Sequence, residues 1–264
     1  MIKKYNEFSE LRELSIKESV VDIASICKEY YIKNWTLNPD GSIDVDGDVT
    51  ISMIFLTKLP LKFGKVTGNF NCNDNKLTTL EGCPTSVGGY FCCHNNQLTT
   101  LEGCPTSVSG YFACNDNQLT TLEGSPKLVD GGFECHRNQL TTLEGCPTSV
   151  GGDFNCRDNK LTTFEGICDD IKGALDCRIN KIINFYGFPD RLIGIELYLS
   201  DNPLGEIYHG IVKGDSRCID LLNMTRSIYG HTVREMGILD IADAIKFDLD
   251  EDWRYCLKSY TLVP

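Results

Sequence analysis

The sequence predicts an α/β solenoid, in which short strands stack coil upon coil into one parallel sheet closed by a helical cap at each end. Three observations predict the stack: over the middle of the chain a cysteine returns every 21 residues, a phenylalanine or leucine precedes each cysteine by two residues, and an asparagine follows it by three. Because one phrase recurs at a fixed interval, one structural unit is copied and stacked. The repeated positions are Phe70, Cys72 and Asn75; Phe91, Cys93 and Asn96; Phe112, Cys114 and Asn117; Phe133, Cys135 and Asn138; Phe154, Cys156 and Asn159; and Leu175, Cys177 and Asn180.

The first 45 residues are expected to form an N-terminal helical cap with a short strand. Residues 9–31 place their apolar side chains at largely helical spacing. The turn-forming run from Asn38 to Gly41 then leads into a strand from Ile43 to Val45. A cap is needed because an open solenoid exposes its core and an unpaired sheet edge.

Residues 46–205 are expected to form about eight coils. Residues two apart in a strand point the same way, so each phenylalanine and its cysteine face the core together. Val49 and Ile51 take these places in a degenerate first coil, and Leu197 and Leu199 take them in a last coil. The asparagines are expected at the corners, where their amides can bond to the backbone of neighbouring coils.

The rest of each copy, Leu-Thr-Thr-Leu-Glu-Gly-Cys-Pro, is too short and too β-branched for a helix, so a tight turn is predicted there. A C-terminal helical cap is expected over residues 206–264, with one helix after Asp215 and Ser216 and another from Ile238 to Phe247.

The unit Phe-x-Cys-x-x-Asn-x-Leu resembles the leucine-rich repeat, with Phe and Cys at two of its leucine positions. The likeness is to the short bacterial repeats of about this length, and the near-identical copies are similar to those of bacteriophage proteins. The resemblance implies a parallel sheet on a concave face and short non-helical turns on the convex side.

Residues beside the core positions point outward and vary far more than the core does. Tyr90 and Tyr111 are adjacent aromatics on an acidic chain that also carries a basic strip, made of His136, Arg137, Arg157 and Arg178. Because Tyr and Arg are enriched where proteins bind, we expect a protein-binding patch, with a merely solvated face as the alternative. The expected binding residues are Tyr90, His94, Tyr111, Glu134, His136, Arg137, Asp153, Arg157, Asp176, Arg178 and Tyr198.

Other functions are less well supported. The balance of 25 Lys+Arg against 37 Asp+Glu, a formal net charge of −12, repels nucleic acid and anionic membranes. No apolar run suits a signal peptide or a membrane span, so a cytoplasmic protein is expected, in the host cytoplasm if a phage encodes it. Inward cysteines without close pairs do not suit zinc, and no metal or cofactor is expected. Cys92 is expected to be exposed beside Cys93.

We expect no catalysis. The alternatives are a ubiquitin ligase using Cys218 in the segment Cys218-Ile219-Asp220, and a structural or virion scaffold protein. The sequence does not identify the protein partner. The chain is expected to be a monomer or a dimer formed through a solenoid end.

Overall fold

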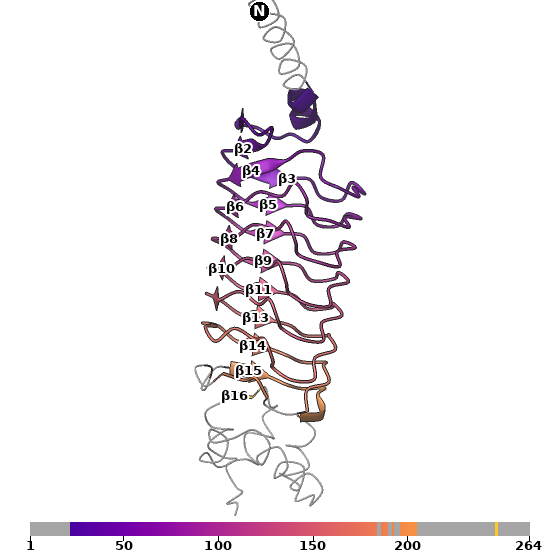
Figure 1. Ribbon diagram of the computed structural model, residues 1–264, viewed down its shortest axis with the longest axis vertical. Helices are drawn as coiled ribbons and strands as arrows, with labels where there is room; N and C mark the ends of the chain where they lie inside the picture. The colour runs from indigo at the N-terminus through magenta and orange to yellow at the C-terminus, as the bar shows by residue number, and fades with distance from the viewer. Residues whose placement is uncertain (1–21, 184–185, 190–191, 193–195, 205–245, 248–264) are drawn as a thin grey trace, which may run out of the picture.

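The computed structural model describes residues 22–183, 186–189, 192, 196–204 and 246–247. The chain forms a β-solenoid in which coils of about 21 residues rise along one axis (Figure 1). Its strands form two sheets, each taking one short strand from most coils. In one sheet, eight strands from Val49 to Tyr198 are linked by seven steps, so the chain completes about seven turns.

The first sheet has seven strands and the second has nine. Along the axis the first contains β1 (Trp35–Leu37), β2 (Ile43–Val45), β4 (Phe63–Val66), β6 (Ser86–Val87), β8 (Ser107–Val108), β10 (Leu128–Val129) and β12 (Ser149–Val150). The second contains β3 (Val49–Thr50), β5 (Phe70–Asn71), β7 (Phe91–Cys92), β9 (Phe112–Ala113), β11 (Phe133–Glu134), β13 (Phe154–Asn155), β14 (Leu175–Asp176), β15 (Glu196–Tyr198) and β16 (Lys246–Phe247).

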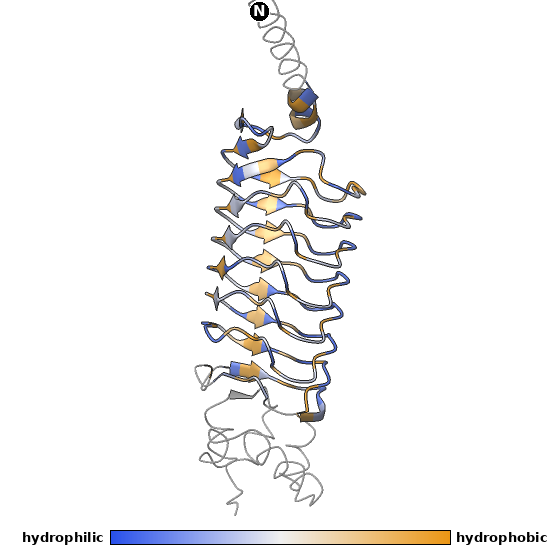
Figure 2. Ribbon diagram, in the orientation of Figure 1, coloured by the Kyte–Doolittle hydropathy of each residue, from blue (hydrophilic) through white to orange (hydrophobic). Residues whose placement is uncertain are grey.

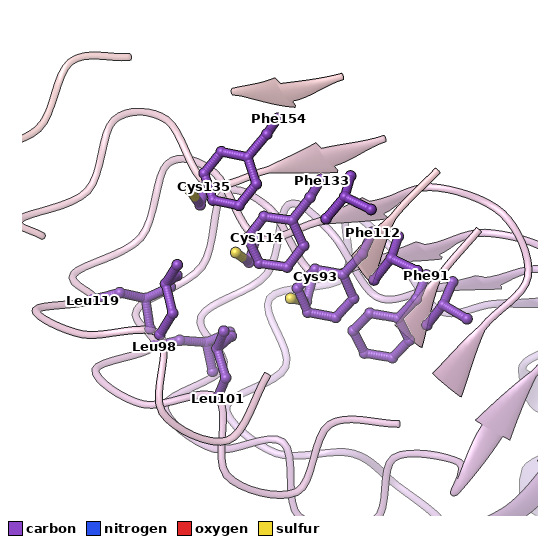
Figure 3. Close-up of a cluster of buried hydrophobic side chains, with 14 of the residues drawn as sticks. Phe91, Cys93, Leu98, Leu101, Phe112, Cys114, Leu119, Phe133, Cys135 and Phe154 are labelled. Carbon is purple, nitrogen blue, oxygen red and sulfur yellow. The ribbon is translucent and has the colours of Figure 1, made fainter. Parts of the chain in front are cut away.

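The core is a set of identical side chains stacked along the axis. Phe91 pairs in register with Phe70 and Phe112, and successive phenylalanine rings stack with centroids 5.2 to 5.6 Å apart from Phe70 to Phe154. The cysteines two residues later are wholly buried and follow the rings in a parallel row (Figure 3). Figure 2 shows the same strands as a largely hydrophobic column. Burying each such phenylalanine stabilises the fold by about 1.5–3 kcal/mol, which makes the ladder a main source of stability.

The corner asparagines join neighbouring coils. The amide nitrogen of Asn96 donates to the carbonyl oxygens of Cys93 at 3.0 Å and of Cys72, one coil earlier, at 3.1 Å. Its amide oxygen accepts from the backbone N–H of Leu77 at 2.9 Å. The same set of bonds returns around Asn117, Asn138, Asn159 and Asn180. The asparagine side chains therefore give hydrogen-bond partners to backbone carbonyl and N–H groups of two neighbouring coils.

Two glycine columns permit the tight winding. Gly103 adopts a φ of +89°, the left-handed region that favours glycine, at the turn after the second leucine. Gly110 stands where a Cβ atom would lie 2.8 Å from the backbone of Gly89 in the preceding coil. The repeated glycines thus mark a turn and a close approach between coils.

The turn opposite the predicted sheet contains strands, which corrects the sequence prediction. The segment is non-helical as expected, but its Ser-Val pairs form β6, β8 and β12, and Leu128 and Val129 form β10. Their valines are buried at the core and pair in register from coil to coil. Strand pairing satisfies backbone groups on this side. The fold is therefore a solenoid with two sheets, parallel from coil to coil, rather than one sheet faced by turns.

At the N-terminal end the predicted turn and the predicted short strand are both present. The run from Asn38 to Gly41 turns the chain between β1 and β2, which pair antiparallel, and β2 has the predicted bounds Ile43–Val45. β2 then pairs with β4 and continues the seven-stranded sheet. Residues 22–29 are helical, whereas the rest of the expected helix before them lies outside the described residues.

The phenylalanine column begins at Val49 of β3, paired with Phe70, and near the C-terminal end it includes Leu197 of β15, paired with Leu175. The expected helix over Ile238–Phe247 is wrong at its last two residues, because Lys246 and Phe247 form β16, parallel to β15. Without β16 the outer edge of β15 would carry unpaired backbone groups, and a paired strand satisfies them directly. The remainder of the expected C-terminal cap, including Cys218, lies outside the described residues.

Candidate protein-binding surface

The outward residues of the nine-stranded sheet form a surface of three columns, called here the outer face. Strand alternation places them there, since the phenylalanine and cysteine of each coil take the inward positions. The first column is Asn69, Tyr90, Tyr111, Gly132, Asp153, Ala174 and Glu196; the second is Asn71, Cys92, Ala113, Glu134, Asn155, Asp176 and Tyr198; the third is Asn73, His94, Asn115, His136, Arg157, Arg178 and Ser200.

An aromatic region occupies the N-terminal half of the outer face. The rings of Tyr90 and Tyr111 stack with their centroids 4.9 Å apart and their planes 15° apart. The Cys92 thiol lies 3.4 Å from the Tyr111 hydroxyl oxygen and donates to it. Tyr111 remains 42% exposed, so it offers a large aromatic surface to solvent.

Cys92 is not the exposed thiol that the sequence predicted. Its side chain is 3% exposed, and burial raises the pKa of the thiol. Strand alternation places Cys92 on the outer face, and the Tyr111 side chain then reaches across it. A raised pKa lowers the thiolate fraction, which removes the basis for a reactive cysteine at this position.

Arg137 and Arg178 of the predicted basic strip lie beside acidic side chains. The Arg178 guanidinium donates to both carboxylate oxygens of Asp176, at 3.0 and 2.7 Å, and lies 5.3 Å from the centroid of the Tyr198 ring. Arg137 has a φ of +52° at the coil corner, where it lies 3.7 Å from Asp116 and 3.9 Å from Asp158. This half of the surface is therefore mixed in charge rather than basic.

Glu134 and His136 lie at the junction between the two halves. The Glu134 carboxylate accepts from the amide of Asn155 at 2.8 Å and lies 3.6 Å from the His136 ring. Burial, and then the neighbouring charges of Asp153 and Asp176, raise the pKa of Glu134. Burial likewise lowers the pKa of His136. Both shifts come first from burial, which disfavours the charged form of each side chain.

The remaining expected binding residues are spread along the face. One carboxylate oxygen of Asp153 accepts from the backbone N–H of Ala174 at 2.8 Å. His94 lies 2.9 Å from the amide of Asn73 and 3.9 Å from Asp74. The Arg157 Nε atom and the His136 Nδ1 atom are buried and make no hydrogen bond within the described part of the chain. The structure thus brings ten of the eleven expected residues onto one face and puts Arg137 at its corner.

Among the described residues, no group of three or more His, Cys, Asp or Glu side chains is arranged to hold a metal ion. None of the helices in the described segments has the length and apolar character that crossing a bilayer requires. The chain matches no protein-family model, and no curated protein matches it either.

Proposed function

We propose that the chain is a leucine-rich repeat protein that binds a protein partner on its outer face and performs no catalysis. The family assignment is supported by the placement of the repeated leucines and asparagines, since the leucines that follow each Asn-x are wholly buried and the asparagines bond the coils together. The proposed likeness to bacteriophage repeats makes a host protein, met in the host cytoplasm, the partner that we propose.

One observation carries the binding role: the copied units keep their inward residues and vary their outward ones. From β5 to β13 the inward pair is always phenylalanine and cysteine, whereas the first outward column passes from Asn through Tyr to Gly and Asp. Side chains on the outer face are not held in the phenylalanine and cysteine rows of the core, so they can differ from coil to coil. A surface that carries exposed tyrosine and arginine on a rigid sheet has the composition of a binding patch.

The binding role is tested with two sets of alanine substitutions. The first set, Tyr90→Ala, Tyr111→Ala, Arg157→Ala and Arg178→Ala, removes the large side chains of the outer face. The matched control, Gln97→Ala, Thr99→Ala, Gln118→Ala and Thr120→Ala, alters exposed residues on another side of the same coils. Each protein is immobilised, and host proteins retained from a lysate are quantified by mass spectrometry.

We expect the wild-type chain and the control to retain a specific host protein. The apparent affinity of that protein for the outer-face variant should fall at least about 30-fold, because hot-spot side chains each contribute about 2 kcal/mol or more. Thermal unfolding of the three chains checks that the fold is kept. Retention by the outer-face variant at wild-type level, or equal loss in the control, contradicts the assignment.

A further inference from the structure

The ladder of aromatic rings on the outer face ends beside a vacant position. Gly132 lies between Tyr111 and Asp153 in the first column. Backbone hydrogen bonds show this order: the N–H of Phe112, which follows Tyr111, donates to the Gly132 carbonyl, and the N–H of Phe133, which follows Gly132, donates to the Asp153 carbonyl. A Cβ atom at Gly132 would meet only backbone atoms of Asp153 within 4 Å, and no side chain. The column therefore lacks one side chain, and Tyr111 and Asp153 stand two strand spacings apart, about 9.6 Å.

The width of this gap suits one planar group. Tyr90 and Tyr111 are stacked at about one strand spacing, so one face of the Tyr111 ring is covered by Tyr90 and the other is turned toward Gly132. The hydroxyl of Tyr111 reaches back toward Cys92, away from the gap. A planar group placed over Gly132 would continue the stack at the spacing that the protein already uses. The gap between Tyr111 and Asp153 above Gly132 is called here the slot.

The charges around the slot select the kind of planar group. Glu134 lies two residues after Gly132 on the same face, and Asp153 follows Gly132 in the first column. One Asp153 oxygen accepts from the Ala174 N–H on the side away from Gly132, and the other oxygen remains to accept from a group in the slot. Within the described segments no cationic side chain forms an ion pair with Asp153. The basic side chain that lies beside Glu134 there is the partly buried His136. A neutral aromatic ring would leave these carboxylates without a counter-charge. A guanidinium is planar, cationic and able to donate to two carboxylates while stacking on a tyrosine.

We propose that the slot receives an arginine side chain of the protein partner, its guanidinium stacked on Tyr111 and donating to Glu134 and Asp153. This inference rests on the proposed binding role of the outer face and adds a chemical requirement to it. The partner presents an exposed arginine, and lysine is a poor substitute because its ammonium cannot stack as a plane.

The test uses a probe that does not require the partner. The full chain, with its 11 tyrosines labelled on their rings, is titrated with N-acetyl-arginine amide while the ring resonances are followed by NMR. The Tyr111→Phe variant identifies the Tyr111 resonance. We expect a saturable shift at Tyr111 with a dissociation constant on the order of 10 mM, as suits one exposed cation over one ring. N-acetyl-lysine amide and the neutral N-acetyl-citrulline amide should each bind at least about threefold more weakly.

Variants of the slot make the test specific. Gly132→Tyr fills the gap without removing any group and should abolish the response to arginine, whereas Ala174→Tyr adds the same ring two positions along the column and should keep it. Glu134→Gln and Asp153→Asn should each weaken binding about two- to fivefold. Circular dichroism melting identifies any variant that fails to fold, and the carboxylate variants, which add no bulk, then carry the test.

Three results would overturn the inference: a response that does not saturate, one that is equal for arginine, lysine and citrulline, or one that persists in Gly132→Tyr. Once a partner is identified, Gly132→Tyr should also lower its capture at least about tenfold, and unchanged capture would overturn the arginine contact too.

If the outer-face alanine set abolishes capture while arginine does not bind, the binding role stands and the slot is wrong. If arginine binds while the alanine set keeps full capture, the binding role itself fails.

Discussion

Each corner asparagine joins two coils through bonds that few other side chains can make. Asn117 donates to the carbonyls of Cys93 and Cys114, both at 3.1 Å, and accepts from the N–H of Leu98 at 3.0 Å. Only an amide combines a donor pair with an acceptor at this length. Because the asparagines are about 9% exposed, water does not readily replace the lost bonds.

Asn117→Ala should therefore lower the free energy of unfolding by about 2–4 kcal/mol, since it leaves several buried backbone groups without partners. The control is Asn115→Ala, which removes an amide bonded to the Asp116 carboxylate at 2.7 Å on the outer side and should change the free energy by less than about 0.5 kcal/mol. Urea unfolding followed by circular dichroism measures both. Equal effects of the two substitutions would show that the corner bonds contribute no more than surface contacts.

Sequence reasoning reaches the inward residues but not the contacts of the outward ones. A fixed spacing of Phe, Cys and Asn determines their side of the strand, since alternation has period two. The exposure of Cys92 depends instead on how the Tyr111 side chain lies one coil away, which no spacing encodes. The pairing of Arg178 with Asp176 could have been inferred, because the two residues are two positions apart on one face.

The turn that follows the second leucine differs in one copy at a cysteine. Cys104 and Cys146 precede a proline there, whereas Cys168 stands where the other copies have that proline. Cys168 consequently has a backbone N–H, which donates to the Cys146 sulfur at 3.2 Å. The hydrogen bond between the two thiols lowers the pKa of Cys168, while burial raises the pKa of Cys104 to about 12.

The two thiols should titrate differently when alkylated. A lowered pKa produces thiolate at lower pH, so the iodoacetamide rate at Cys168 should level off within about pH 6–10, while the rate at Cys104 should still be rising. Limited access reduces the rate at Cys168 without moving the midpoint of its profile. Peptide mapping by mass spectrometry reads each site separately. Cys146→Ala should move the Cys168 midpoint to higher pH; an unchanged midpoint would mean that Cys146 does not set it.

The same turns contain the strands that the sequence did not predict. β6, β8 and β12 are each only a Ser-Val pair, and alternation cannot be recognised over two residues. These residues become strands because identical pairs lie in register one coil away. The segment is short, rich in β-branched residues and interrupted by glycine and proline, which excludes a helix but does not distinguish a paired strand from a turn.

The whole molecule behaves as a one-dimensional stack, in which each coil contacts its neighbours. Nearly all strand pairs of the solenoid are parallel and offset by 21 residues, and the corner and core side chains bond or stack across the same interval. Stability is then approximately the sum of coil and interface contributions. What matters for folding is the interval, because a slip of one residue would turn every inward side chain outward.

Two deletions separate coil register from chain length. Removing residues 89–109 takes out one full coil and joins Gly88 to Gly110, which has the same place in its copy as Gly89. The remaining coils should therefore stack in register and unfold cooperatively. The free energy of unfolding should fall by a few kcal/mol, on the order expected for one repeat. Removing residues 89–108 takes out one residue fewer and should destroy cooperative unfolding, since the remaining copies meet one position out of register. Thermal and urea unfolding of both chains measures the difference. If the shorter deletion folds as well as the longer one, the 21-residue interval does not determine the stack, and the match between repeat length and coil length is incidental.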